Sequence, residues 1–285
     1  MISQTPLPNQ EALNSLLQRE VVASDLSSAD WRAVSATIRQ ESFFSARTLL
    51  EDYLATAKDT IAGLLNPGTE QRADRITPEN PEGNVTTGQS DAYARAQLRE
   101  LLGKLNYAPA PEDSGTIKDL SSDQRIDLVL TTNKQLAQGQ GNWLQSQRTG
   151  VLDSFPADEL FRLENRVKKR DWLYRFRLAG EQTGDPIGTG WTITPDGRMI
   201  ALKNHAIWHW IGSSELFSDA LDVIWPPFAF NSGMWVRDVS RRVCEQIGLL
   251  QKGQAAPKPA NILSALKLFA EKISALAGAR EEVPA

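Results

Sequence analysis

Two histidines are the first residues in this chain whose spacing is compatible with chemistry. His205 and His209 stand four residues apart in N-H-A-I-W-H-W, and on a helix this spacing places both imidazoles on one face, as two zinc ligands require. The zinc-protease pattern has a glutamate directly after the first histidine, but Ala206 occupies that position. No nearby acidic cluster supplies a third ligand, so we predict neither a metal nor another cofactor. A hydrolase or transferase that uses either histidine with a carboxylate is kept as an alternative.

Other residues that could attack a substrate or bind phosphate lack the neighbours that such chemistry needs. Ser232 in N-S-G-M has no G-x-S-x-G frame, so it does not resemble the nucleophile of the hydrolases that use this turn. The G-T-G at 188–190 and the G-Q-G at 139–141 are too short for phosphate-binding loops, and we interpret both as turns or loops. Cys244, the single cysteine, is interpreted as a buried structural thiol. We therefore predict that the chain is not an enzyme.

Residues 162–177 concentrate positive charge. They hold seven basic residues against two acidic ones, in a chain with a formal net charge of −4. Aromatic residues alternate with the basic ones and could stack on nucleic-acid bases while the cations contact phosphates. The alternative that we favour is an amphipathic helix or strand whose charges are solvated or pair with the acidic N-terminal region. The candidate nucleic-acid contacts are Arg166, Lys168, Lys169, Arg170, Trp172, Arg175 and Arg177.

Six of the eight tryptophans lie between Trp172 and Trp235. This block contains W-T-I-T-P-D-G-R-M-I-A-L-K at 191–203, in which two alternating strands flank a Pro-Asp-Gly turn, and W-P-P-F-A-F-N-S-G-M-W at 225–235. Aromatic residues and arginine concentrate binding energy at interfaces, and a rigid Pro-Pro turn presents them at low entropic cost. We predict structural or interface roles for Arg198, Lys203, Trp208, Trp225, Pro226, Pro227, Phe228, Asn231, Ser232, Gly233, Met234 and Trp235.

The elements that position this block are expected to be mainly helical. Apolar periodicity predicts a helix over 10–22, and a second one from the capping Ser27 or Ser28 to Asn66. That second helix would exceed thirty residues and span about 50 Å at 1.5 Å per residue, so two shorter helices broken near 42–45 are the alternative. Further helices are predicted at 91–106, from 122 to 138, from Pro156 onward, and at 241–247 behind the capping Ser240.

The expected fold class is mainly α with a small α+β C-terminal block, in which long helices precede a Trp-rich domain containing a β-hairpin. The C-terminal helix carries an apolar heptad seam that could oligomerise, bind a partner or fold back on the chain. The expected regions are an N-terminal helical region at 1–66, a Pro/Gly-rich linker at 67–90, a helical region at 91–160, the Trp-rich α+β domain at 161–250, a linker at 251–260 and an amphipathic helix at 261–285.

Composition limits the classes of protein that the chain can belong to. At 285 residues, with 41% hydrophobic and 23% charged residues, one large or two modest globular domains are expected. The N-terminus lacks the pattern of a signal peptide, and no apolar run is long enough for a membrane span, so no membrane association is predicted. A single cysteine excludes an intramolecular disulfide and fits a reducing interior such as bacterial cytoplasm.

Six stretches that follow one another over residues 30–250 resemble, in this order, the phage head morphogenesis proteins of the Mu-type minor head protein family. The most specific are R-M-I-A-L-K and P-P-F-A-F-N-S-G-M. The stretches are D-W-R-A-V-S-A-T-I-R-Q-E-S-F-F-S-A-R, A-R-A-Q-L-R-E-L-L-G-K-L-N-Y-A-P, G-T-I-K-D-L-S-S-D-Q-R-I-D-L-V-L-T-T-N with G-Q-G, F-P-A-D-E-L-F-R-L-E with R-D-W, G-R-M-I-A-L-K-N-H-A-I-W, and P-P-F-A-F-N-S-G-M-W-V-R-D-V.

The resemblance implies a component of the prohead or virion, present in few copies, that acts with the portal and major capsid proteins in the cytoplasm of a bacterial host. It further implies that the helix with Arg125, Thr131 and Thr132 leads into a small domain ending in a Pro-Pro-aromatic turn, which Pro226 to Phe228 match. Many members place cysteines and a histidine around that turn, which suggests a metal-stabilised knot. Phe230, Asn231 and Ser232 stand there in this chain, so no metal is carried over and tryptophan packing is expected instead.

Overall fold

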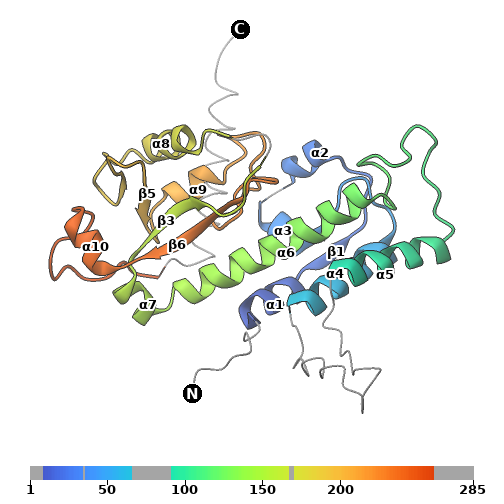
Figure 1. Cartoon of the computed structure of the whole chain (residues 1–285), viewed down its shortest axis with the longest axis horizontal. Helices are drawn as coiled ribbons and strands as arrows, with labels where there is room; N and C mark the ends of the chain where they lie inside the picture. The colour runs from blue at the N-terminus through green and yellow to red at the C-terminus, as the bar shows by residue number, and fades with distance from the viewer. Residues whose placement is uncertain (1–8, 35, 66–90, 167–169, 260–285) are drawn as a thin grey trace, which may run out of the picture. The chain divides into compact units, whose positions relative to one another are not determined.

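The computed structural model describes residues 9–34, 36–65, 91–166 and 170–259 (Figure 1). The predicted linker at 67–90 and the predicted helix at 261–285 therefore lie outside the described residues. The chain divides into two compact units: unit 1 comprises Met1–Ala33 and Glu41–Gly141, and unit 2 comprises Val34–Gln40 and Asn142–Ala285. Helices dominate the described chain and a small antiparallel sheet lies in unit 2, in outline agreement with the expected fold class. None of these helices is long and apolar enough to cross a membrane.

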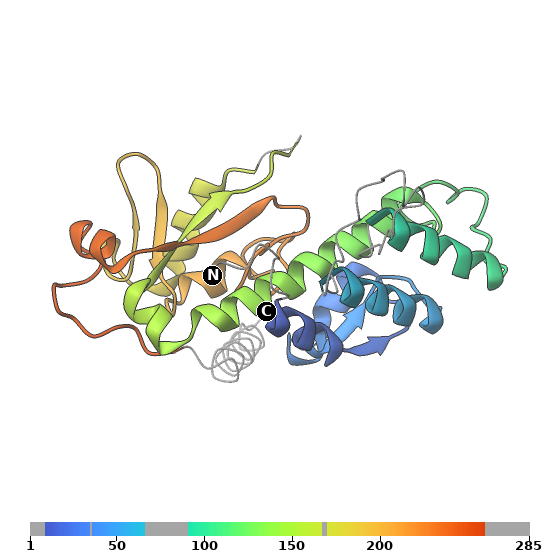
Figure 2. The same cartoon turned by 60° about the horizontal axis from the view of Figure 1, so that its bottom comes forward.

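Unit 1 is built from helices around a two-stranded parallel sheet. Helices α4 and α5 pack side by side, as Figures 1 and 2 both show. The sheet pairs β1 with β2, so that Val21 lies opposite Phe43. The elements are α1 (Gln10–Leu17), β1 (Glu20–Val22), α2 (Ser28–Ala33), β2 (Ser42–Phe44), α4 (Glu51–Leu65), α5 (Asp91–Lys104) and α6 (Asp123–Ser146), the last of which belongs to unit 1 as far as Gly141.

The prediction of one helix from Ser27 or Ser28 to Asn66 is wrong; the alternative is confirmed in its break near 42–45, but the residues before the break form two helices instead of one. The chain forms α2, then α3 (Ala36–Glu41), then strand β2, and becomes helical again only at Glu51. Strand pairing with β1 buries Phe43 completely. Arg47 follows with a φ of 54°, which no α-helix accommodates. Likewise, the predicted helix at 10–22 ends at Leu17, because Glu20–Val22 are needed for this sheet.

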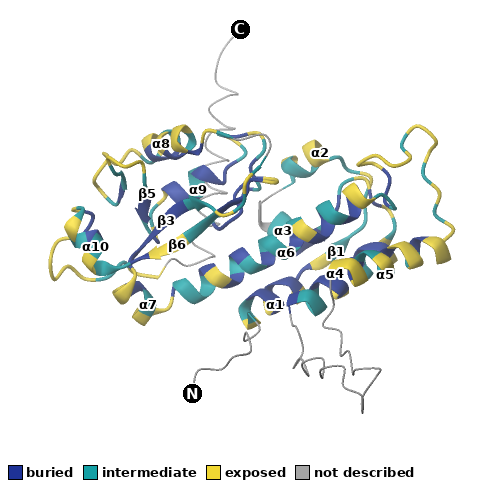
Figure 3. Ribbon diagram, in the orientation of Figure 1, coloured by how far each residue is buried: buried dark blue, intermediate teal, exposed yellow. Residues whose placement is uncertain are grey.

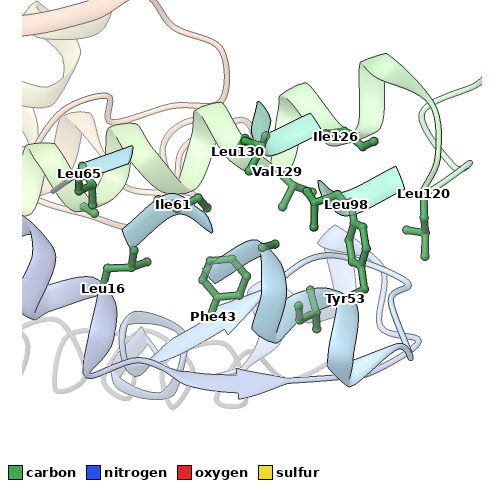
Figure 4. Packing of buried hydrophobic residues seen from close by; sticks show 14 of the residues in the cluster. Leu16, Phe43, Tyr53, Ile61, Leu65, Leu98, Leu120, Ile126, Val129 and Leu130 are labelled. Atoms are coloured by element: carbon green, nitrogen blue, oxygen red, sulfur yellow. The ribbon is translucent and has the colours of Figure 1, made fainter. Parts of the chain in front are cut away.

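Aliphatic side chains from α1, α4, α5 and α6 form the core of unit 1, with Phe43 and Tyr53 as its aromatic members (Figure 4). Arg125, at the start of α6, reaches from the helix to the turn after β2. Its Nη2 donates to Ser45 Oγ at 2.6 Å, to Thr48 Oγ1 at 3.2 Å and to the Ala46 carbonyl oxygen. A buried arginine thus fixes α6 to the segment that interrupts the predicted long helix.

Helix α6 is longer than predicted, because G-Q-G at 139–141 continues it instead of forming a turn. A Cβ added at Gly141 would lie 2.5 Å from the backbone nitrogen of Ala12 in α1. Glycine at this position therefore permits a close approach of two helices, which offsets its poor intrinsic helix propensity.

Unit 2 contains a four-stranded antiparallel sheet with the order β4-β5-β3-β6. The predicted hairpin is confirmed: Ile193 pairs with Met199 across the Pro-Asp-Gly turn, where Gly197 has a φ of 83°. The elements are α7 (Thr149–Ser154), β3 (Ala157–Arg162), α8 (Trp172–Thr183), β4 (Trp191–Ile193), β5 (Met199–Leu202), α9 (Ile207–Ile211), β6 (Met234–Val239) and α10 (Arg241–Gln246).

The predicted helix after Pro156 is wrong, because A-D-E-L-F-R forms the strand β3. This strand lies between β5 and β6, with Glu159 opposite both Ile200 and Arg237. Carboxylates at 158 and 159 suit the first turn of a helix, but here each has cationic partners on neighbouring strands or just beyond them. Long-range pairing has overridden the local preference.

The two faces of the sheet carry different apolar clusters. Leu160, Ala201 and Met234 pack against α8 and α9, where Trp208 stacks on Phe228 with ring centroids 5.8 Å apart. Ala157, Ile200 and Val239 on the other face pack against Cys244 of α10 and against Leu249 and Leu250, which come after it. Cys244 is therefore a buried structural thiol, as predicted, and burial raises its pKa to about 11.

Candidate partner-binding site

The Pro-Pro turn between α9 and β6 is an ordered loop held by its own side chains. Phe228, Asn231 and Gly233 adopt positive φ values of 60°, 49° and 66°. The hydroxyl of Ser232 donates to the Pro227 carbonyl oxygen at 2.6 Å and accepts from the backbone N–H of Met234 at 3.1 Å. Ser232 is buried and its proton is engaged. It therefore closes the turn and is not placed as a nucleophile.

Most residues predicted for structure or interface at this turn form the core of unit 2. Trp225 and Phe228 are each 1% exposed. Aromatic packing thus holds the block, as expected in the absence of cysteines. Only Phe230, at 37% exposure, and its neighbour Asn231 are exposed, while Trp235 is half-buried. The buried members of the predicted set are Lys203, Trp208, Trp225, Pro226, Pro227, Phe228, Ser232, Gly233 and Met234.

Arg170, a candidate nucleic-acid contact, instead braces the turn. Its Nη2 donates to the Phe230 carbonyl oxygen at 2.7 Å and its Nη1 to that of Asn231 at 3.3 Å. Its Nε also contacts Asp219, whose other carboxylate oxygen accepts from Arg175 Nη2 at 2.9 Å. One carboxylate therefore orders two arginines, and the turn is fixed from outside as well as from within.

The remaining nucleic-acid candidates do not form a stacking surface. Trp172 is buried beneath Arg175, whose guanidinium carbon lies 5.2 Å from the indole centroid. Arg166 pairs with Glu164, and Arg177 is exposed. Lys168 and Lys169 lie outside the described residues. Base stacking by Trp172 is therefore excluded by its burial.

The segment does form an amphipathic helix, as favoured, with Asp171 capping α8 through the backbone N–H of Tyr174 at 2.9 Å. However, the carboxylates that pair with its arginines are Glu164 and Asp219 of the same unit. The expected pairing with the acidic N-terminal region is therefore wrong for these three arginines.

Glu159 organises two further arginines across the sheet. Its Oε2 accepts from Arg198 at 2.6 and 3.0 Å, and its Oε1 accepts from Arg237 at 2.6 Å. Burial opposes ionisation of Glu159, but the hydrogen bonds from Arg237 and Arg198 outweigh it and hold its pKa below the ordinary value. Arg198 is thus held by an ion pair to β3 and not to the Pro-Pro turn. No motif indicated Glu159, because its partners are 39 and 78 residues away in sequence.

Lys203 is also anchored by ion pairs, and its side chain is completely buried. Asp158 and Asp238 face each other on adjacent strands, and Lys203 Nζ contacts Asp238 and lies 3.6 Å from Asp158. The Lys203 ammonium group therefore pairs with the carboxylates of both Asp158 and Asp238. Burial raises the pKa of Asp158 to about 7, against the opposing effect of Lys203.

The two histidines do not lie on one helix. His205 precedes α9 and only His209 lies within it, so the spacing of four residues does not place them on a common helical face. Nδ1 of His205 accepts from the Ile207 N–H at 3.2 Å, while Nε2 lies 3.3 Å from Asp185 Oδ2 without a hydrogen bond of good geometry. Burial lowers the His205 pKa. No group of three potential ligands occurs among the described residues.

The site consists, then, of a braced turn that exposes Phe230 next to Arg170, which Asp219 holds, and of two arginines on the sheet that Glu159 holds. The sequence marked the turn and the arginines, but it gave no signal for these two carboxylates. Comparison of the chain with protein-family models, with curated proteins and with solved structures found no match.

Proposed function

We propose that this chain is a non-enzymatic minor head protein of a phage or prophage, which acts with the portal and major capsid proteins during head assembly and is located in the prohead or virion. The observation that supports the proposal is that three of the stretches that resemble this family pair in one sheet. Strand β5 contains R-M-I-A-L-K residues, and β6 begins at the end of P-P-F-A-F-N-S-G-M. Both pair with β3, which comes from F-P-A-D-E-L-F-R-L-E.

This arrangement supports the resemblance, because stretches that lie about forty residues apart along the chain pair with one another in a single sheet. β3 and β5 supply the sheet, and the Pro-Pro turn supplies the aromatic residues that cover it. A braced turn that exposes Phe230 is suited to docking, since little conformational entropy is lost when a rigid aromatic binds. The proposal is therefore an assembly component that presents a preformed surface.

The test is capture of portal and major capsid protein by the tagged full-length chain, co-expressed with the neighbouring genes of its phage or prophage. Phe230→Ala should weaken capture while the melting temperature stays within about 2 °C, because the side chain is exposed. Phe228→Ala is unsuitable for this purpose, since it removes a core residue. Tyr174→Ala, at an exposed aromatic on α8, is the matched control. If wild type captures neither protein, the proposal is wrong.

Two alternative functions can each be tested directly. For a DNA-contacting packaging or ejection protein, binding of duplex DNA should fall steeply with salt and depend on Arg177, the exposed candidate within the described part of α8. For a hydrolase or transferase, His205→Gln should abolish turnover with an unchanged melting temperature. The ring contacts of His205 favour instead a loss of stability, since Asp185 and the Ile207 N–H both lose their partner.

A further inference from the structure

One part of the sheet in unit 2 belongs to neither of the two apolar clusters that cover the sheet in the described chain. Side chains alternate between the two faces of a strand, so Glu159 and Phe161 of β3 share a face with Trp235 and Arg237 of β6, their cross-strand partners. α10 and the residues after it cover the other end of this face at Ala157, Ile200 and Val239. The remaining part, which we call the open half-face, comprises Glu159, Phe161, Arg198, Trp235 and Arg237, with Leu163 at its end.

The open half-face is accessible where a partner would need it. Arg237 is exposed, Phe161 and Trp235 are half-buried, and Leu163 just beyond β3 is 57% exposed. Figure 3 shows that β6 is largely half-buried or exposed (teal and yellow), whereas β3 is mostly buried (dark blue). Leu163 is held beside the start of β6, because its backbone N–H donates to the Gly233 carbonyl oxygen at 2.9 Å. An aliphatic side chain is thus fixed in an exposed position.

Guanidinium N–H donors on the open half-face favour an acidic partner. Arg198 and Arg237 share the carboxylate of Glu159, and Asp196 in the hairpin turn interacts with Arg198, so Arg237 has only Glu159 as its acidic partner among these residues. Each guanidinium carries five N–H donors, of which Glu159 takes two from Arg198 and one from Arg237. Leu163 also lies within the basic stretch 162–177, in which seven basic residues stand against two acidic ones. In a chain with a net charge of −4, this is a local region of opposite sign.

The aromatic residues favour a protein rather than a nucleic acid as the partner. A sheet that binds single strands presents the faces of its aromatic rings to the bases. Here the guanidinium carbon of Arg237 lies 5.3 Å from the centroid of Phe161, so one face of that ring is already covered. An exposed leucine beside a half-buried tryptophan is instead typical of a protein interface.

We propose that the open half-face binds an acidic segment of a partner protein that also carries apolar side chains. Leu163 and Trp235 contact the apolar side chains, and the outward N–H groups of Arg198 and Arg237 donate to carboxylates. This inference rests on the proposed function, because it states where on the chain the portal or capsid protein binds and what chemistry it brings.

The test measures capture of co-expressed portal and major capsid protein by four full-length chains: wild type, Leu163→Asp, Arg237→Gln and Leu49→Asp. Leu49 is an exposed leucine of unit 1, at 69% exposure, and does not belong to the open half-face, so it serves as the matched control. Leu163→Asp should weaken binding roughly tenfold or more, because it removes an apolar contact and repels acidic residues. Arg237→Gln, which leaves Glu159 paired with Arg198, should weaken binding less and reduce its salt dependence.

The outcomes separate the two proposals. If all four chains capture the partner equally, the open half-face is not the binding site, while the proposed function stands. If wild type captures neither protein, the proposed function is wrong, and a synthetic peptide of alternating glutamate and leucine then decides the inference. A shift of the 5-fluorotryptophan signal of Trp235 that is lost in Leu163→Asp supports an acidic ligand. No shift, or tighter binding of a single-stranded oligonucleotide, overturns it.

Discussion

The two units bury charge in different ways. In unit 1, the buried Arg125 and Arg19 are bound by neutral acceptors, namely hydroxyls and a carbonyl for Arg125 and the Gln140 side chain for Arg19. Burial lowers the pKa of Arg19 to about 10. In unit 2, Glu159 and Asp222 are buried carboxylates that pair with arginines. Contacts in both units join residues far apart in sequence, but those of unit 2 are ion pairs, whereas those of unit 1 fix α6 through neutral groups to the turn after β2 and to Arg19 after α1.

This difference has a functional meaning. A buried carboxylate that orders two arginines leaves some of their N–H donors facing outward, as at Glu159. A buried arginine bound to neutral groups, such as Arg125, holds its own unit together and offers little to a partner. Pairs of arginines ordered by one buried carboxylate are thus seen in unit 2, where the exposed Phe230 and Leu163 also lie. We therefore propose that the binding surfaces lie in unit 2, and stability measurements can test the difference in how the two units bury charge.

The largest effect is expected for Phe228→Ala. Phe228 is buried and stacks on Trp208, so its loss should cost about 3–5 kcal/mol of unfolding free energy. Seven of the eight tryptophans belong to unit 2, so tryptophan fluorescence during urea unfolding reports mainly on that unit. The matched variant in unit 1 is Phe43→Ala, which should act on far-UV circular dichroism more than on fluorescence. Equal shifts of both signals in both variants would show that the units unfold as one.

Arg125→Met should destabilise unit 1 by about 2–3 kcal/mol, because three acceptors lose their donor. The measurement is urea unfolding followed by circular dichroism. Arg99→Met is the control, since Arg99 pairs with Asp123 on the surface and its replacement should cost less than about 0.5 kcal/mol. Equal effects of the two substitutions would mean that the buried contacts contribute nothing beyond a surface pair.

Ser232→Ala should cost about 1–2 kcal/mol, because the Pro227 carbonyl and the Met234 N–H both lose a buried partner. Thermal unfolding followed by tryptophan fluorescence measures this loss. Asn231→Gly is the contrasting variant at the same turn: its φ of 49° suits glycine, so the expected change is smaller than about 0.5 kcal/mol. An unchanged melting temperature for Ser232→Ala would contradict the role of the hydroxyl in closing the turn.

The remaining prediction concerns Asp158 and the dependence of stability on pH. Its pKa is raised from 3.8 to about 7, first by burial and further by Asp238, while Lys203 opposes the shift. Because the folded protein binds this proton more tightly than the unfolded chain, the contribution is fully present below pH 3.8 and is lost as pH rises through 7. The stability difference between wild type and Asp158→Asn should therefore fall from pH 5 to pH 8. Cys244 of α10, the other nearby titratable group, has its pKa raised to about 11 and stays protonated over this range. Parallel stability curves would refute the assignment.

Much of the secondary structure could be predicted where the signal is local. The hairpin followed from Pro195 to Gly197, and α10 followed from Ser240 and Gly248 on either side of it. β3 could not be predicted, because A-D-E-L-F-R has the acidic start of a helix and its strand partners lie about 40 and 80 residues further along the chain. The predicted single helix from 28 to 66 failed for the same reason: β2 separates α3 from α4, and it exists only through its pairing with β1.

For the candidate site, too, local features could be predicted from the sequence and long-range contacts could not. The position of the Pro-Pro turn and the basic character of the stretch before α8 were visible in the sequence. The roles of individual side chains were not. Arg170 and Trp172 are two residues apart, yet one braces the turn from outside while the other lies in the core. Asp219, which orders Arg170 and Arg175, belongs to no recognisable motif.

The sequence by itself determined the helical character of unit 1, the hairpin, the Pro-Pro turn and the concentration of aromatic residues in unit 2, because each depends on neighbouring residues along the chain. Only the tertiary structure decided which aromatic residues pack and which are exposed, and which arginines are held by carboxylates. Burial and ion pairing join positions tens of residues apart, as in Glu159 with Arg237 or Trp208 with Phe228. Those contacts made Phe228 a core residue and left Phe230 and Leu163 exposed.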